Sequence, residues 1–90
     1  MTNVQQMSVV AEQQQLGEDR LAWLALALTP ALGPKRIVDA MLQVGTPSLV
    51  FTLGLTELEG LRFPAQSAQF IFDGKARRAA EVELSLIHIY

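Results

Sequence analysis

Two basic residues that directly follow a proline have types and spacing suited to chemistry. Lys35 and Arg36 come after Pro34, at the expected start of a helix. The first turn of a helix leaves backbone N–H groups without partners, and the helix dipole favours an anion there. This arrangement suits contact with a phosphate group. The candidate contacts to DNA phosphates are therefore Leu32, Gly33, Lys35 and Arg36.

Residues 28–36 have the layout of a helix-hairpin-helix. That motif usually has glycine on both sides of the apolar hairpin residue, and Ala31 stands at the first of these positions. A Cβ restricts left-handed backbone geometry and the close approach of a phosphate, and Pro34 has no N–H to donate. Because basic residues are common near helix starts, we favour a plain link between two helices, with Leu32 in the core, over direct phosphate contact.

A second basic cluster precedes the end of the chain. It consists of Lys75, Arg77 and Arg78, which stand near Asp73 and Glu81. Opposite charges at such spacings are typical of a solvated helix face, and we favour that interpretation over a binding site.

The remaining polar and aromatic residues do not predict catalysis. His88 is the only histidine, and no nucleophile is paired with a base, so we expect no enzyme, no metal site and no cofactor. Glu57 and Glu59 are explained as helix-start residues. Trp23, the only tryptophan, could stack on a base, but its leucine neighbours favour core packing.

Length and composition limit the class of protein. Ninety residues, half of them hydrophobic and none cysteine, suit one small domain held together by packing, which predicts a cytoplasmic location. The longest apolar run, residues 21–28, is too short to cross a membrane. A net charge of -2 means that any contact with nucleic acid depends on a local basic feature.

Proline and glycine divide the chain into helices. Pro30 disfavours helical geometry in the residue before it and so ends a helix that begins near Glu18. Gly45 and Gly54 are placed to end two further helices. The fold class predicted is all-α, a small bundle of about four to five short helices that is helix-hairpin-helix-like or SAM-like. The expected helices are residues 18–28, residues 34–44, a short one after residue 47, another near residue 56 and a last one from residue 64.

Helical spacing predicts which faces are buried. Residues 21–28 are apolar nearly all round, which is typical of a central helix. A capping box is expected at Thr56 and Glu59. In the second helix the expected buried face is Ile37, Val38, Met41 and Leu42, and the polar face is Lys35, Arg36, Asp39 and Gln43. In the last helix Ala68, Phe72, Ala76, Ala79 and Ala80 recur at helical spacing, with Gly74 tolerated.

Both ends of the chain are expected to lie outside the domain. Residues 1–17 are rich in glutamine, lack a clean apolar period and predict a flexible tail before a domain at residues 18–83. Residues 84–90 turn abruptly to an apolar, β-prone string that matches a translated sequencing adaptor, so we expect a non-native tail there. The alternative is a strand leading into a following domain.

Four motifs occur in an order that resembles the N-terminal region of the DprA/Smf family of DNA-processing proteins. The resemblance covers about residues 21–83, and Ala31 is its clearest departure from the family pattern. An unrelated helix-hairpin-helix repair protein would share the hairpin but not the order of the later motifs. The motifs are LAWLAL at residues 21–26, PALGPKR at 30–36, GTPSLVF at 45–51 and LTEL at 55–58.

The resemblance implies a helical accessory domain that precedes a Rossmann-like domain. In this family the whole protein binds single-stranded DNA in natural transformation (competence), helps to load a RecA-type recombinase, and forms homo-oligomers through the Rossmann-like domain. No membrane partner is implied. Two hypotheses follow: a nucleic-acid-binding module that uses Lys35 and Arg36, and a protein-docking or scaffold domain without DNA contact.

Overall fold

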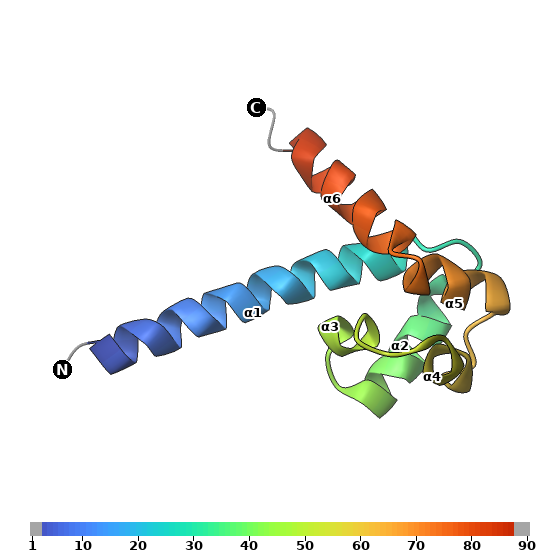
Figure 1. Ribbon diagram of the computed structural model, residues 1–90, viewed down its shortest axis with the longest axis horizontal. Helices are drawn as coiled ribbons and strands as arrows, with labels where there is room; N and C mark the ends of the chain where they lie inside the picture. The colour runs from blue at the N-terminus through green and yellow to red at the C-terminus, as the bar shows by residue number, and fades with distance from the viewer. Residues whose placement is uncertain (1–2, 88–90) are drawn as a thin grey trace.

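The computed structural model describes the backbone of residues 3–87 and the side chains of residue 14 and residues 16–86. Within residues 3–87 the chain forms six helices and no strand, so the predicted all-α bundle is confirmed (Figure 1). The helices are α1 (Asn3–Ala27), α2 (Gly33–Val44), α3 (Pro47–Val50), α4 (Leu55–Gly60), α5 (Ala65–Phe72) and α6 (Lys75–Ile87).

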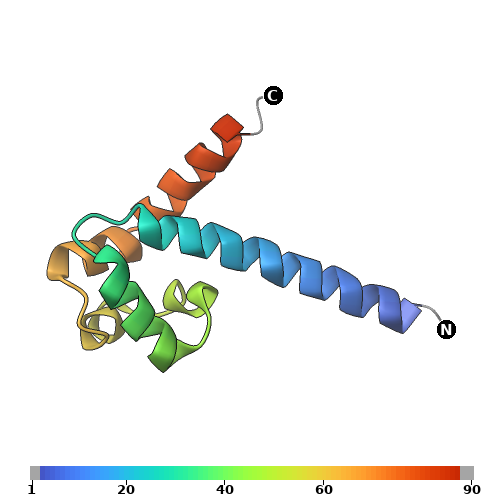
Figure 2. The ribbon, with the colours of Figure 1, turned by 180° about the vertical axis from the view of Figure 1, so that it is seen from behind.

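The four shorter helices gather at the C-terminal end of α1. Helix α1 packs against α3 and α6, while α5 packs against α4 and α6. The N-terminal part of α1 and the far end of α6 point away from the other helices in both views (Figures 1 and 2). The core therefore forms where the C-terminal half of α1 meets the rest of the chain.

Every helix contributes to one core. Leu26, Val50 and Leu58 are fully buried, and complete burial of such a side chain stabilises the fold by about 1.5–3 kcal/mol. Small residues at the helix crossings let the axes approach closely. The core cluster comprises Ala25, Leu26, Leu32, Ile37, Ala40, Val50, Leu58, Leu61, Phe63, Ala68, Ile71, Ala76 and Ala80.

Helix α1 is longer than predicted and less buried. It begins at Asn3 and continues through Gly17, so the prediction of a start near Glu18 is wrong. Trp23 is 45% exposed, so its predicted core position is also wrong. The reason is geometric: α1 shows the bundle one face, which Ala22 and Ala25 occupy, and Trp23 lies on another. That residues 1–17 form a flexible tail stays a prediction.

Helix α2 buries part of the predicted face. Ile37 is buried and Met41 packs against the core as predicted, whereas Val38 and Leu42 are exposed and Ala40 is buried. The side chain at position 40 is small and lets α2 lie close to its neighbours, which turns the larger Val38 and Leu42 toward solvent. Gly45 ends α2 as predicted, with a φ of 97°.

Two features of the later helices differ from prediction. Gly74 has a φ of +81° and separates α5 from α6, because glycine adopts the left-handed conformation that closes a helix. Phe72, the last residue of α5, is exposed, although Ala68 one turn earlier is buried. The expected capping pair of Thr56 and Glu59 is replaced by one two residues earlier, in which the Gly54 N–H donates to Oε1 of Glu57 over 3.1 Å.

The C-terminal residues continue α6 as far as Ile87. The alternative of a strand over residues 84–90 is therefore wrong for residues 84–87, while residues 88–90, with His88, lie outside the described part of the chain. The non-native origin of residues 84–90 stays a prediction.

Candidate nucleic-acid interface

The α1 side of the hairpin between α1 and α2 is held by two side-chain hydrogen bonds. The buried Thr29 hydroxyl donates to the Ala25 carbonyl over 2.7 Å. The Ser67 hydroxyl, from α5, donates to the Pro30 carbonyl over 2.7 Å. Leu32 is only 1% exposed and belongs to the core. The hairpin is therefore fixed relative to α5, so the start of α2 has a defined position.

The hairpin backbone is left-handed on both sides of Leu32. The φ angle is +66° at Ala31 and +76° at Gly33. The first of these is the position at which the helix-hairpin-helix motif usually has glycine and this chain has Ala31. The backbone therefore takes the conformation that suits glycine, although alanine adopts it at a cost of about 1–2 kcal/mol.

Replacing Ala31 by glycine should raise the free energy of unfolding by about 0.5–1 kcal/mol. The substitution relieves the left-handed strain, and the greater freedom of glycine in the unfolded chain offsets only part of that gain. Urea unfolding followed by circular dichroism measures the change. The matched control is Ala79→Gly in α6, which should destabilise the chain by about 1 kcal/mol. Equal destabilisation by both substitutions would contradict the strain at Ala31.

A groove separates the start of α2 from the turn between α4 and α5. That turn shares one half of the plan of the first hairpin, since Leu61 is buried and the residue after it, Arg62, has a φ of +67°. The turn is held by the Arg62 N–H, which donates to the Glu59 carbonyl over 2.9 Å. The groove brings together two segments far apart in the sequence, and its lining is residues 32–36, 39, 42, 43 and 60–62.

Three cations from two elements line this groove. Lys35 and Arg36 come from α2, and Arg62 comes from the α4–α5 turn. All three are exposed, and within the described residues none of them forms an ion pair. Asp39 is the one acidic residue in the lining, so the groove carries a local positive charge on a chain whose net charge is negative.

Sequence reasoning missed Arg62. The residue stands in an alternating run in which Leu61 and Phe63 are buried and Arg62 is exposed. An apolar-basic-apolar run between Gly60 and Pro64 was the signal for a second hairpin with an outward cation. That signal does not say which other element the cation faces.

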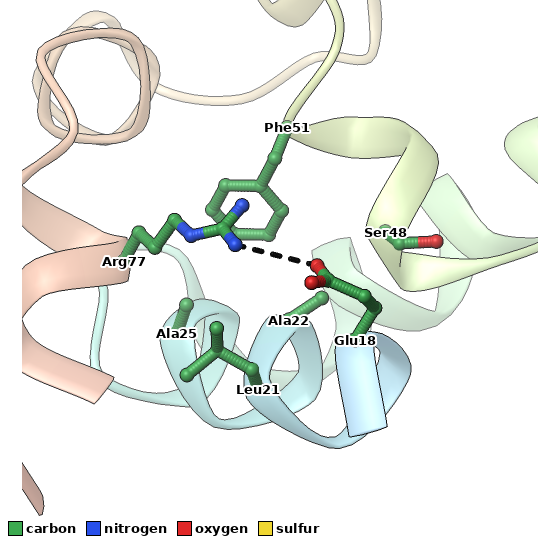
Figure 3. A pocket seen from close by; sticks show the side chains of 7 residues that line it. All are labelled: Glu18, Leu21, Ala22, Ala25, Ser48, Phe51 and Arg77. Carbon is green, nitrogen blue, oxygen red and sulfur yellow. Dashed lines mark hydrogen bonds and ion pairs between the residues drawn. The ribbon is translucent and has the colours of Figure 1, made fainter. Parts of the chain in front are cut away.

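In the second basic cluster, Arg77 forms ion pairs, whereas Lys75 and Arg78 do not within the described residues. Arg77 donates to Oε2 of Glu18 in α1 over 3.3 Å (Figure 3). The Nε atom of Arg77 also lies 3.9 Å from Oε1 of Glu81. Arg77 therefore holds α6 to α1, and its charge is matched by carboxylates. Lys75 and Arg78 are exposed on the same helix.

A small cavity lies beneath the Arg77 and Glu18 pair. Its volume is about 20 Å³, and Leu21, Ala22 and Phe51 line its apolar side (Figure 3). Such a volume holds about one water molecule. The cavity is therefore a packing gap between α1, α3 and α6, too small for an organic ligand.

The described residues offer neither a metal site nor a membrane-spanning helix. Among these residues, no three His, Cys, Asp or Glu side chains are grouped so that they could hold a metal ion. In the same part of the chain, no helix has the length and apolar character required to cross a membrane. Comparison of the chain with protein-family models, curated proteins and solved structures finds no match.

Proposed function

We propose that this chain is a cytoplasmic accessory module that binds nucleic-acid phosphates for a larger DNA-processing protein. The observation that carries the proposal is the groove where Arg62 joins Lys35 and Arg36, with none of the three ion-paired. The proposal includes what the resemblance to the DprA/Smf family implies: a following Rossmann-like domain that supplies the main binding to single-stranded DNA and the homo-oligomer, and a role in loading a RecA-type recombinase.

The physical basis is release of counterions by a small number of fixed cations. Three phosphate contacts on a single strand give a slope of log affinity against log salt of about -2. Such binding is weak at physiological salt, as expected for a module that assists a main binding domain. The hydrogen bond from Ser67 to Pro30 supports the proposal, because it fixes the hairpin before any ligand arrives.

Neutralising the two α2 cations tests the proposal. The double variant Lys35→Gln, Arg36→Gln should bind a fluorescein-labelled single strand more weakly than the parent and reduce the salt slope by about 1.4, because two contacts are lost. Fluorescence anisotropy at several salt concentrations measures both quantities. The matched control is Lys75→Gln, Arg78→Gln, which makes the same charge change on α6.

The control distinguishes binding at a local site from attraction by the net charge of the whole chain. We expect the α6 variant to keep the parent salt slope. Equal losses in the two double variants would show that net charge alone governs binding and would refute the groove as the site. An unchanged affinity after neutralisation of Lys35 and Arg36 would refute it as well.

A protein-docking role is the second candidate. Trp23 on α1 and Leu49 on α3 are both exposed, on two helices that pack against each other. Exposed aromatic and aliphatic side chains on rigid helices suit a protein partner. Because Trp23 is the only tryptophan, its fluorescence reports docking directly. A blue shift on addition of the recombinase, lost in Leu49→Ser, would favour this role.

A further inference from the structure

One side of α1 is uncovered within the described part of the chain. Leu16 is 59% exposed, and Trp23, seven residues further along the same side of the helix, is 45% exposed. Arg20 lies between them on that side and Ala27 lies beyond them, and both are exposed. Ala25, on the opposite side, is buried in the core. We call positions 16, 20, 23 and 27 the outer stripe of α1.

The spacing of the outer stripe continues toward the N-terminus in the sequence. Val9, Leu16 and Trp23 are seven residues apart. An apolar residue at every seventh position is part of the repeat of helices that pair side by side. The intervening positions carry Gln13 and Arg20, and polar residues there lower the stability of a helix pair while restricting its alignment. The stripe therefore suits a weak but specific contact with another helix.

The N-terminal part of α1 has no packing partner among the described helices. Residues 3–17 continue α1 beyond the bundle and point away from the other helices in both ribbon views (Figures 1 and 2). Most helical stability in proteins comes from packing one face of a helix against a partner, and Gly17 lowers the helix propensity of this segment further. A helix in this place therefore needs a surface that covers it.

The covering surface has to match α1 in length. Helix α1 has 25 residues and spans about 37 Å, whereas α6, the next longest, has 13 residues. Within residues 3–87, only α1 provides a helix of that length with one side uncovered. A second copy of the chain supplies a second α1, and a two-fold axis brings the same stripe of both copies into contact.

Charge selects the direction of such a pair. Glu12 is the only charged residue in the part of α1 outside the bundle, and Arg20 is the only charged residue of the stripe. If the two helices run in opposite directions with Leu16 at the centre, Glu12 of each copy lies opposite Arg20 of the other. Val9 then lies opposite Trp23 of the second copy. If the helices run in the same direction, two arginines oppose each other, which is repulsive.

We infer that the chain forms a dimer in which two copies of α1 pair in opposite directions through their outer stripes. The pair uses neither the groove nor its cations, so it is independent of the proposed phosphate site. The bundle of each copy gathers at the C-terminal end of its own α1, so the dimer holds its two bundles at opposite ends of the helix pair (Figure 1).

Sedimentation velocity of the full chain tests the pairing. From about 1 µM to 1 mM, the apparent mass should rise from the 9.9 kDa of one chain toward twice that value. Leu16→Glu places two carboxylates against each other at the centre of the pair and should weaken association more than about tenfold. The matched control is Leu86→Glu, the same change at a leucine of similar exposure at the far end of α6, which should leave association unchanged.

An exchange of charges tests the direction of the helices. Arg20→Glu should weaken association, because carboxylates then face each other at positions 12 and 20. The double variant Glu12→Arg, Arg20→Glu should restore the association of the parent chain, since opposite charges face each other again. In a pair that runs in the same direction each position faces itself, so the exchange would restore nothing.

Every other outcome overturns the inference. A parent chain that stays at the mass of one copy at about 1 mM does so, and so does association that survives Leu16→Glu. Equal losses from Leu16→Glu and Leu86→Glu would show that net charge, and not the stripe, governs association. Failure of the charge exchange to restore association would exclude the opposite direction. All of these results leave the proposed phosphate groove untouched, because its residues are unchanged in each variant.

Discussion

Replacing Leu32 by alanine should lower the free energy of unfolding by about 3 kcal/mol. Leu32 is 1% exposed and inserts from the first hairpin into the core. Truncating such a leucine removes its transfer free energy and leaves a cavity, which together cost about 2–5 kcal/mol. Small domains have only about 5–15 kcal/mol of stability in total, so this one substitution removes a large share. Urea unfolding followed by far-ultraviolet circular dichroism measures the loss.

Leu42 provides the control for this experiment, because it is a leucine of the same chain in the opposite environment. Leu42→Ala should change stability by less than about 0.5 kcal/mol, since the side chain is 83% exposed. If Leu32→Ala is too unstable to purify, Leu32→Met conserves the volume and should cost less than about 1.5 kcal/mol. Similar losses from Leu32→Ala and Leu42→Ala would contradict the placement of the hairpin in the core.

Reversing all three groove cations should reduce affinity for a single strand by about 100-fold at low salt, because each attractive contact becomes repulsive. The variant is Lys35→Glu, Arg36→Glu, Arg62→Glu. Arg62 matters most to the interpretation, because it comes from a different element. The triple variant should therefore bind more weakly than the double variant Lys35→Glu, Arg36→Glu, which keeps Arg62. Anisotropy titrations of the two variants at one salt concentration make the comparison.

The triple variant has a control of equal charge. Arg20, Lys75 and Arg78 are exposed, lie outside the groove and form no ion pair within the described residues. Reversal of these three should weaken binding far less than reversal of the groove residues. If Arg62→Glu adds nothing to the double variant, the α4–α5 turn does not belong to the site, and the candidate interface contracts to the start of α2.

The helix boundaries were predictable where proline or glycine restricts the backbone. Pro30 and Gly45 mark the ends of helices in both the prediction and the structure, because the restrictions that these residues impose act on the nearest peptide units. Gly74 was judged tolerable inside a helix and instead separates two helices. A glycine can either continue a helix or end it, and the packing of α5 and α6 decides which of the two occurs.

The faces of the helices were harder to predict than their ends. Trp23, Val38 and Leu42 were expected to be buried from their hydrophobicity, and all three are exposed. The small alanines Ala25 and Ala40 occupy the buried positions instead. Burial of a large hydrophobic residue stabilises the fold. A small residue, however, lets two helices approach each other, so that more of the surrounding side chains are buried. That balance depends on the partner helix, which the sequence of one helix does not contain.

By itself, the sequence determined that the chain is helical, where a hairpin interrupts the first two helices, and that Lys35 and Arg36 stand at the start of the second. These properties depend on backbone restrictions and spacings within a few residues. The tertiary structure alone decided that Arg62 lies across a groove from these residues and that Leu42 is left exposed beside them. Both depend on how separate helices pack, since burial of the core residues on all six helices sets the position of every turn between them.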